Sequence, residues 1–236
     1  QRMGIPIYTD IDIFVQQWHK PVYAITGSNG KSTVVKLVHD ALVSAGKRCC
    51  MLGNIGQPVL ASLRQEDMYD CAVVEISSFQ LYWSKRIDVD CACIVNIYPN
   101  HLDWHDSWLC YIKSKLRIFQ DAQITISHYQ CSDLLEQHGV SKPTYWIGHP
   151  QERVDPGLSK LLDSTPTSLQ QSIRSAWVIA EAIGISKSHR VSAFAQFQPW
   201  PYRCQKIPAS CGYWYNDAKS SNLAAARHAL KSIYAK

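Results

Sequence analysis

The amino-acid sequence predicts an α/β fold, in which a mostly parallel sheet carries helices on both faces. Short apolar runs alternate along the chain with longer segments of helical periodicity, the pattern of strands joined by crossover helices. The first apolar run leads through a glycine-containing turn into a helix, as a parallel connection requires. With 236 residues, 46% of them hydrophobic and 18% charged, the chain can build one substantial domain and part of another.

The first predicted elements are an acidic helix-like stretch at 10–17 and a buried strand at 22–26. Apolar residues then recur at helical spacing over 31–45, and Gly46 ends this helix. The same reasoning predicts, in chain order, a strand at 49–52, a helix at 58–63, strands at 71–76 and 91–97, a helix at 108–119 and a strand at 122–126.

The last third of the chain contains a predicted helix at about 169–183, closed by Gly184. A proline-rich segment at 198–201 marks a boundary, after which a strand at 212–215 and a helix at 222–234 begin a new unit. We therefore expect the end of an N-terminal domain or a linker at 1–20, a central domain at 21–205 and the start of an incomplete C-terminal domain at 206–236.

Charge and composition exclude several classes of partner. The net charge of +5 is spread without a basic block, which argues against nucleic acid and membrane surfaces and favours small anions such as phosphates. No apolar run reaches the ~18 residues of a membrane span, and no signal peptide is visible. The nine cysteines form no paired CxxC motifs, so we expect buried reduced thiols and a cytoplasmic protein.

The strongest motif is the turn between the first predicted strand and helix, TGSNGKST at 26–33. Backbone N–H groups at a helix start form an anion site, and glycines let phosphate approach the backbone. Lys31 can reach terminal phosphates and the Ser32 hydroxyl can bind Mg²⁺, although the first glycine precedes Gly30 by fewer residues than in the general P-loop. A turn that uses glycine only for its geometry is the alternative. The predicted nucleotide-binding residues are Gly27, Ser28, Asn29, Gly30, Lys31, Ser32 and Thr33.

This loop resembles the TGxxGK[ST] loop that Mur ligases share with folylpolyglutamate synthases. Residues 53–56 (GNIG) and 74–81 (VEISSFQL) resemble the Mur ligases that add D-glutamate. Three more segments match in order: 96–103, 113–117 and 215–222. The resemblance covers nearly the whole chain. It implies a P-loop-type central domain of the Mur ligase family, with the edges of two flanking domains.

The resemblance also implies roles for the matched residues. The expected catalytic set is Lys31, Glu75, His101 and Lys115. Glu75 would share a Mg²⁺ with Ser32, while His101 and a carbamylated Lys115 would hold a second Mg²⁺. Apart from the resemblance, Glu75 follows a buried strand, so its carboxylate is expected at the carboxyl end of the sheet, where ligands bind. By the same resemblance, Asn54 and Ser77 would contact the muramoyl substrate or phosphates. The residues implied to bind the nucleotide are Arg203, Asp217 and Lys219.

The implied activity is that of an ATP- and Mg²⁺-dependent ligase of peptidoglycan synthesis. It would join D-glutamate to UDP-N-acetylmuramoyl-L-alanine through an acyl phosphate, as a monomer in the cytoplasm. Two alternatives remain: a degenerate or fragmentary nucleotide-binding module without ligase activity, and a folylpolyglutamate synthase-like ligase, which residues 77–80 disfavour. Because the family has three domains, we expect these 236 residues alone to be catalytically incompetent.

The sequence departs from the family pattern mainly where adenine would bind. The family's His-Asn-x-x-Asn motif corresponds to residues 168–172, which contain no asparagine. Pro99-Asn100 replaces an acidic pair of the family. Tyr202 replaces the histidine of the family's usual Pro-His-Arg. The segment between the strand at 122–126 and the helix near 169 is also shorter than usual. We therefore expect intact phosphate and metal chemistry with altered adenine recognition.

Overall fold

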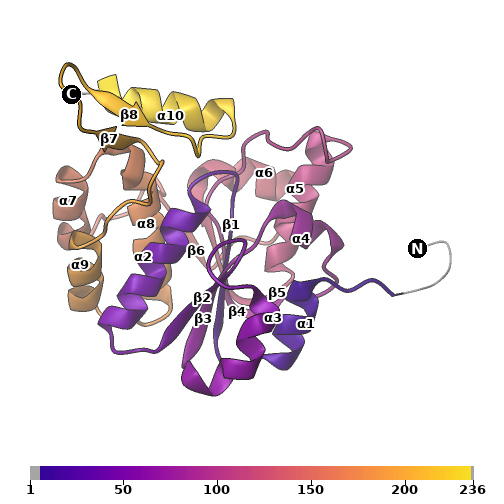
Figure 1. Cartoon of the computed structure of the whole chain (residues 1–236). Helices are drawn as coiled ribbons and strands as arrows, with labels where there is room; N and C mark the ends of the chain where they lie inside the picture. Colours follow the sequence, from indigo (N-terminus) through magenta and orange to yellow (C-terminus); the bar gives the residue numbers. More distant parts are fainter. Residues whose placement is uncertain (1–5, 235–236) are drawn as a thin grey trace.

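A computed structural model describes residues 6–234, without the side chains at positions 168, 228, 232 and 234. Its main sheet has six parallel strands in the order β2-β3-β1-β4-β5-β6 (Figure 1). The strands are β1 (Val22–Thr26), β2 (Cys49–Gly53), β3 (Cys71–Glu75), β4 (Asp88–Ile94), β5 (Asp121–His128) and β6 (Tyr145–Ile147). The predicted α/β fold with a parallel sheet is confirmed.

Helices cover both faces of this sheet (Figure 1). One face carries α2 (Lys31–Ser44), α7 (Pro156–Asp163), α8 (Thr167–Ala182) and α9 (Lys187–Ala195). The other carries α1 (Asp10–Gln17), α3 (Val59–Ser62), α4 (Ser78–Trp83), α5 (Trp108–Leu116) and α6 (Ser132–Gln137). Short 3₁₀ turns extend three of the connections: η1 (Leu63–Met68), η2 (Arg117–Phe119) and η3 (Tyr129–Cys131).

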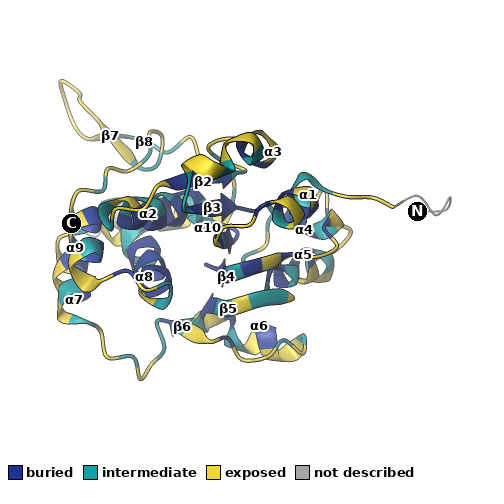
Figure 2. Cartoon of the chain, turned by 90° about the horizontal axis from the view of Figure 1, so that it is seen from below, coloured by how far each residue is buried: buried dark blue, intermediate teal, exposed yellow. Residues whose placement is uncertain are grey.

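Each face of the sheet buries its own apolar cluster, because successive side chains of a strand point to opposite sides. In β4, Cys91 and Cys93 pack into the cluster beneath α2 and α8. Ala92 and Ile94 join the cluster on the opposite face. The central strands are therefore buried on both sides and mostly dark blue in Figure 2. These thiols fill the core as small hydrophobic groups, as predicted. The expectation of buried thiols holds for six of the nine cysteines and is wrong for the rest: Cys110 and Cys204 are half-buried and Cys211 is exposed, because they lie outside the central strands.

After α9 the chain forms a separate antiparallel hairpin, β7 (Gln205–Ile207) and β8 (Trp214–Asn216), followed by α10 (Leu223–Tyr234). Helix α10 contacts α8. Because β7 begins at Gln205, the hairpin lies across the expected boundary at 205/206, and the domain limits stay a prediction. The part of the expected N-terminal segment before Pro6 lies outside the described residues.

Several observed elements differ from the predicted ones at their ends. Strand β4 spans Asp88–Ile94 rather than 91–97, because the chain after Ile94 turns toward the β1–α2 loop. The helix predicted at 58–63 continues as η1, and the strand predicted at 212–215 is β8. Within residues 6–234, no helix has both the length and the apolar character needed to cross a membrane.

Candidate functional site

The predicted phosphate loop joins β1 to α2 at the carboxyl edge of the sheet. Gly30 has φ +78°, in the left-handed region that glycine adopts without strain, and leads directly into the first turn of α2. No side chain caps this helix start. Its first-turn N–H groups can therefore serve a bound anion.

Asn96, two residues beyond the end of β4, holds the loop from the β4 side. Its Oδ1 accepts the backbone N–H groups of Ser28 at 3.1 Å and Asn29 at 2.9 Å. Its Nδ2 donates to the Asn29 carbonyl at 3.0 Å. Asn96 was part of a matched motif without an assigned role. A polar residue that follows a buried strand was the available signal.

The Ser28 hydroxyl also shapes the loop rather than pointing freely into the cavity. It donates to the Tyr98 carbonyl at 2.9 Å and accepts the Tyr98 N–H at 2.8 Å. The Tyr111 hydroxyl lies 2.7 Å from the same oxygen. Ser28 was predicted to bind nucleotide, and its hydroxyl is instead engaged in hydrogen bonds that hold the loop.

Lys31 folds back over the loop. Its Nζ donates to the carbonyl oxygens of Gly27 at 2.9 Å and Ser28 at 3.3 Å. Burial lowers the pKa of Lys31 below its ordinary value; Glu75 opposes this shift, and Arg203 adds to it. An ammonium held only by carbonyl oxygens at a helix start can exchange these contacts for phosphate oxygens.

Glu75, the last residue of β3, is 1% exposed. Its Oε1 accepts the Asn54 Nδ2–H at 2.9 Å, whereas its Oε2 is buried without a hydrogen-bond partner in the described structure. Burying an oxygen of this kind is costly unless a cation or donor meets it. Asn54, predicted as a substrate contact, thus orients the Glu75 carboxylate.

Lys115, from α5, is 1% exposed and lies beneath the phosphate loop. Its Nζ donates to the Gly27 carbonyl at 2.9 Å and to Thr26 Oγ1 at 3.3 Å, and lies 4.9 Å from the centre of the Tyr111 ring. Burial moves the pKa of Lys115 well below its ordinary value, and Lys31 adds to this shift, while Glu75 opposes it. Burial therefore favours the neutral, nucleophilic form of this amine.

His101 has φ +53° and lies after Asn100, whose Oδ1 accepts the His101 N–H at 3.1 Å. Its ring packs edge-on against Phe79, with ring centres 4.8 Å apart. Burial lowers the pKa of His101, and Lys31 and Lys115 act in the same direction. The imidazole is therefore neutral, the form that binds metals.

These donors fit a small divalent cation. The unpartnered Glu75 Oε2 and the Ser32 hydroxyl are hard oxygen donors of the kind that Mg²⁺ takes. Among residues 6–234 no cluster of three or more His, Cys, Asp or Glu side chains is arranged to hold a metal. A magnesium site at Glu75 and Ser32 would therefore combine one carboxylate with hydroxyl, phosphate and water oxygens.

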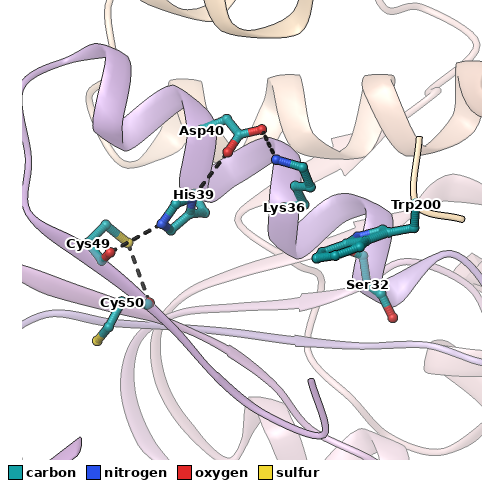
Figure 3. Close-up of polar contacts among 7 residues, drawn as sticks. All are labelled: Ser32, Lys36, His39, Asp40, Cys49, Cys50 and Trp200. Atoms are coloured by element: carbon teal, nitrogen blue, oxygen red, sulfur yellow. Dashed lines mark hydrogen bonds and ion pairs between the residues drawn. The ribbon is translucent and has the colours of Figure 1, made fainter. Parts of the chain in front are cut away.

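The segment after α9 lines the cavity next to the first turn of α2. Arg203 Nη2 donates to the Ser32 hydroxyl at 3.1 Å, and Trp200 Nε1 donates to the Ser32 carbonyl at 3.3 Å. Figure 3 shows Trp200 beside the first turns of α2, where Lys36 pairs with Asp40 at 2.7 Å. Nothing in the sequence pattern had pointed to Trp200.

Asp217 and Lys219 attach the hairpin to this segment. An Asp217 carboxylate oxygen accepts the Cys204 N–H at 2.8 Å, and the Lys219 N–H donates to the Tyr202 carbonyl at 3.2 Å. The two residues predicted to hold nucleotide thus meet the Arg203 segment from the start of the C-terminal unit.

A cavity of about 1020 Å³ brings together most of the predicted site residues. It is lined by Ser28, Asn29, Gly30, Lys31, Ser32, Thr33, Asn54, Glu75, His101, Arg203, Asp217 and Lys219. Gly27 and Lys115 do not line it but contact each other beneath the loop. Ser77 does not line it either: its hydroxyl caps α4 by accepting the Gln80 N–H at 3.2 Å.

Comparison with known proteins gives a family match and several similar sequences. A family model described as the Mur ligase middle domain matches residues 25–142. The UDP-N-acetylmuramoylalanine–D-glutamate ligase of Legionella pneumophila (strain Paris) is 34% identical over 257 aligned positions, covering 99% of this chain and 57% of that protein. The enzyme of the same name from Nitrosococcus oceani is 31% identical, covering 98% and 55%. The chain therefore spans little more than half the length of these relatives.

Solved structures show the same fold. MurF from Acinetobacter baumannii has a TM-score of 0.69 at 17% identity, covering 94% of this chain and 56% of that one. A bifunctional folylpolyglutamate synthase/dihydrofolate synthase from Yersinia pestis, solved with AMPPNP and a Mn ion, has a TM-score of 0.67 at 15% identity, covering 97% and 71%. At these identities the likeness concerns the fold alone.

Proposed function

Because the chain belongs to the Mur ligase family, we propose that it supplies the ATP-binding part of a D-glutamate-adding ligase of peptidoglycan synthesis. The reaction would join D-glutamate to UDP-N-acetylmuramoyl-L-alanine through an acyl phosphate. The similarity to D-glutamate ligases from Legionella and Nitrosococcus supports this choice within the family. We further propose that the protein acts as a monomer in the cytoplasm, a reducing compartment in which free thiols such as those of its core persist.

The observation that carries the proposal is that Lys31 and Glu75 line the same cavity at one edge of the sheet. Lys31 presents an ammonium held by two carbonyl oxygens at the start of α2. Glu75 presents a buried carboxylate oxygen with no hydrogen-bond partner in the described structure. A phosphate that reached Lys31 and a cation that reached Glu75 would satisfy both groups at once.

We assign the phosphates of ATP to the first turn of α2 and Lys31. Ser32 and Glu75 would hold one Mg²⁺, and His101 a second. Bound Mg²⁺ would neutralise phosphate charge that repels an attacking carboxylate. The base would lie toward Leu169, Gln171 and Ser172, which line the same cavity from α8. Since no asparagine is present there, the adenine contacts would differ from the family pattern.

Lys115 would act beside the second Mg²⁺ as a carbamate. In its neutral form the amine can attack the carbon of CO₂: the N–C bond forms, one C=O π bond opens, and the proton lost from nitrogen passes to solvent, so that an anionic oxygen ligand replaces the amine. Burial of Lys115 favours this uncharged form before the step. Without this modification, Lys115 would offer the second Mg²⁺ no oxygen ligand.

The proposal predicts that Lys31→Ala abolishes nucleotide use without unfolding the protein. Turnover of ATP, measured in a protein of the relatives' full length that contains these residues, should fall at least about a hundredfold. The thermal midpoint should stay within a few degrees. Lys36→Ala, on the same helix but paired with Asp40, should retain turnover. Unchanged turnover in Lys31→Ala would remove the basis for the phosphate site.

A further inference from the structure

One reciprocal side-chain contact attaches the C-terminal unit to the phosphate loop. Asn222 Nδ2 donates to Asn29 Oδ1 at 2.8 Å, and Asn29 Nδ2 donates back to Asn222 Oδ1 at 3.3 Å. The two residues are 193 positions apart in the chain. The contact therefore joins the β1–α2 loop to the segment that opens α10.

Asn222 has a second task in the same position. Its Oδ1 accepts the Ala225 N–H at 2.9 Å, which caps the start of α10. An asparagine amide can accept from the helix and donate to Asn29 simultaneously. Aspartate has no donor in its ionised form, and serine can cap the helix but is too short to reach Asn29. The residue type at 222 thus matches both contacts.

On the loop side, the backbone of Asn29 is already fixed. Its N–H and its carbonyl are both bound by Asn96, so neither of the two peptide groups that flank its Cα can rotate without breaking a hydrogen bond. Its side chain lines the cavity and meets Asn222. Asn222 itself is not among the residues that line the cavity. An effect of Asn222 on a bound phosphate would therefore pass through Asn29.

A second contact fixes how the C-terminal unit is oriented on the phosphate loop. Arg203, which precedes the hairpin, donates to the Ser32 hydroxyl in the first turn of α2. Asp217 accepts the N–H of the residue that follows Arg203. The C-terminal unit therefore meets the phosphate loop at both ends of the Asn29–Ser32 stretch, and Asn222 supplies one of the two points.

We propose that Asn222 is a positioning residue for nucleotide binding: it fixes the Asn29 side chain and ties the placement of α10 to the shape of the phosphate loop. This inference rests on the proposed binding of ATP at the loop. Such a tie makes the geometry of the phosphate loop depend on the C-terminal unit. Losing it should loosen the loop without removing any phosphate ligand.

The test compares Asn222→Ser, Asn222→Ala and Asn29→Ala in the 236-residue chain, together with the Asn29→Ala/Asn222→Ser double variant. Hydrogen exchange without nucleotide should be faster at the amides of residues 29–31 in Asn222→Ser than in the unaltered chain. Calorimetry with Mg²⁺ and AMPPNP should show about three- to tenfold weaker binding, the value of one exchanged hydrogen-bond contact. The double variant should bind no more weakly than Asn29→Ala.

The variants separate positioning from helix capping. Asn222→Ser keeps a cap for α10, so its thermal midpoint should fall less than that of Asn222→Ala, which loses the cap as well as the contact with Asn29. Asn216→Ser, in β8, is the matched control and should leave exchange at residues 29–31 unchanged. Unaltered exchange and affinity in Asn222→Ser would overturn the inference. If the unaltered chain binds no AMPPNP, the proposed function fails, and the exchange measurement still decides the role of Asn222.

Discussion

Glu75 is held in the folded protein at an energetic cost. Its carboxylate is almost fully buried, and only one of its two oxygens has a hydrogen-bond partner in the described structure. Desolvation of a charged group costs several kcal/mol unless a nearby charge offsets it, and the Lys31 ammonium offsets part of this cost. Functional sites commonly retain such costs, because the same group must meet a ligand.

We therefore predict that Glu75→Gln makes the chain more stable and less able to bind Mg²⁺-nucleotide. Removing the buried charge should raise the free energy of unfolding by about 1 kcal/mol, measured by urea denaturation. Affinity for Mg²⁺ with AMPPNP should fall at least about tenfold, because the neutral amide offers the cation no charge. Glu136→Gln, at an exposed position of α6, should change neither quantity. A destabilised Glu75→Gln would show that the carboxylate serves packing instead.

Single residues could be predicted from the sequence when their neighbours formed a motif, but their partners could not. Glu75 was expected at the carboxyl end of a strand, and the structure places it there. Ser77 was expected to contact a ligand, yet its hydroxyl caps α4. A serine two residues after a strand can bind a ligand or start a helix, and both uses give the same local sequence. Asn96 and Asn222 gained their roles only from contacts distant in sequence.

Among the elements, the long periodic helices were predicted, whereas several of the short elements were missed. The predicted helices at 31–45 and about 169–183 correspond to α2 and α8, which bury continuous apolar faces. Strands β6 and β7 have three residues each, too few to show any periodicity. Helix α7 was missed although Asp155-Pro156 begins it with an N-cap and an N1 proline. That signal was present in the sequence and could have been used.

The end of β2 provides a prediction about how an element positions the site. Gly53 has φ +98°, and a Cβ there would lie 2.3 Å from the Glu75 carbonyl oxygen. Gly53→Ala should therefore push apart the ends of β2 and β3, next to the Glu75 carboxylate. The expected loss of unfolding free energy is about 3 kcal/mol or more, from left-handed strain plus the clash.

Gly46→Ala is the matched control for this substitution. Gly46 has φ +77°, but a Cβ there would meet nothing within 4 Å. Only the strain of the left-handed backbone remains, so the free energy of unfolding should fall by about 1 kcal/mol. Urea denaturation of the two variants measures the difference. Equal losses would mean that the sheet edge at Glu75 adjusts freely.

At the scale of the whole molecule, the site combines segments that sequence order keeps far apart. The phosphate loop, the last residue of β3, the segment around Arg203 and the start of α10 all meet at one cavity. The parallel sheet explains why β1 and β3 contribute to the same edge, which the sequence predicted. The return of residues 200–222 across α2 depends on the packing of α8 and α10, which no local pattern reports.

The last prediction concerns these 236 residues as a catalyst. The chain spans 57% of the length of the Legionella ligase, while its cavity presents the groups proposed for phosphate and metal. Ligation requires a carboxylate, a γ-phosphate and an amine in line, and a misplacement of ~1 Å can cost about a hundredfold in rate. We therefore expect weak binding of Mg²⁺-nucleotide and no ligation. Phosphate release with ATP, Mg²⁺ and UDP-N-acetylmuramoyl-L-alanine should not respond to D-glutamate, whereas the Legionella enzyme, as the positive control, should respond under identical conditions. A D-glutamate-dependent rate from the 236 residues would mean that the aligned geometry is complete within this chain.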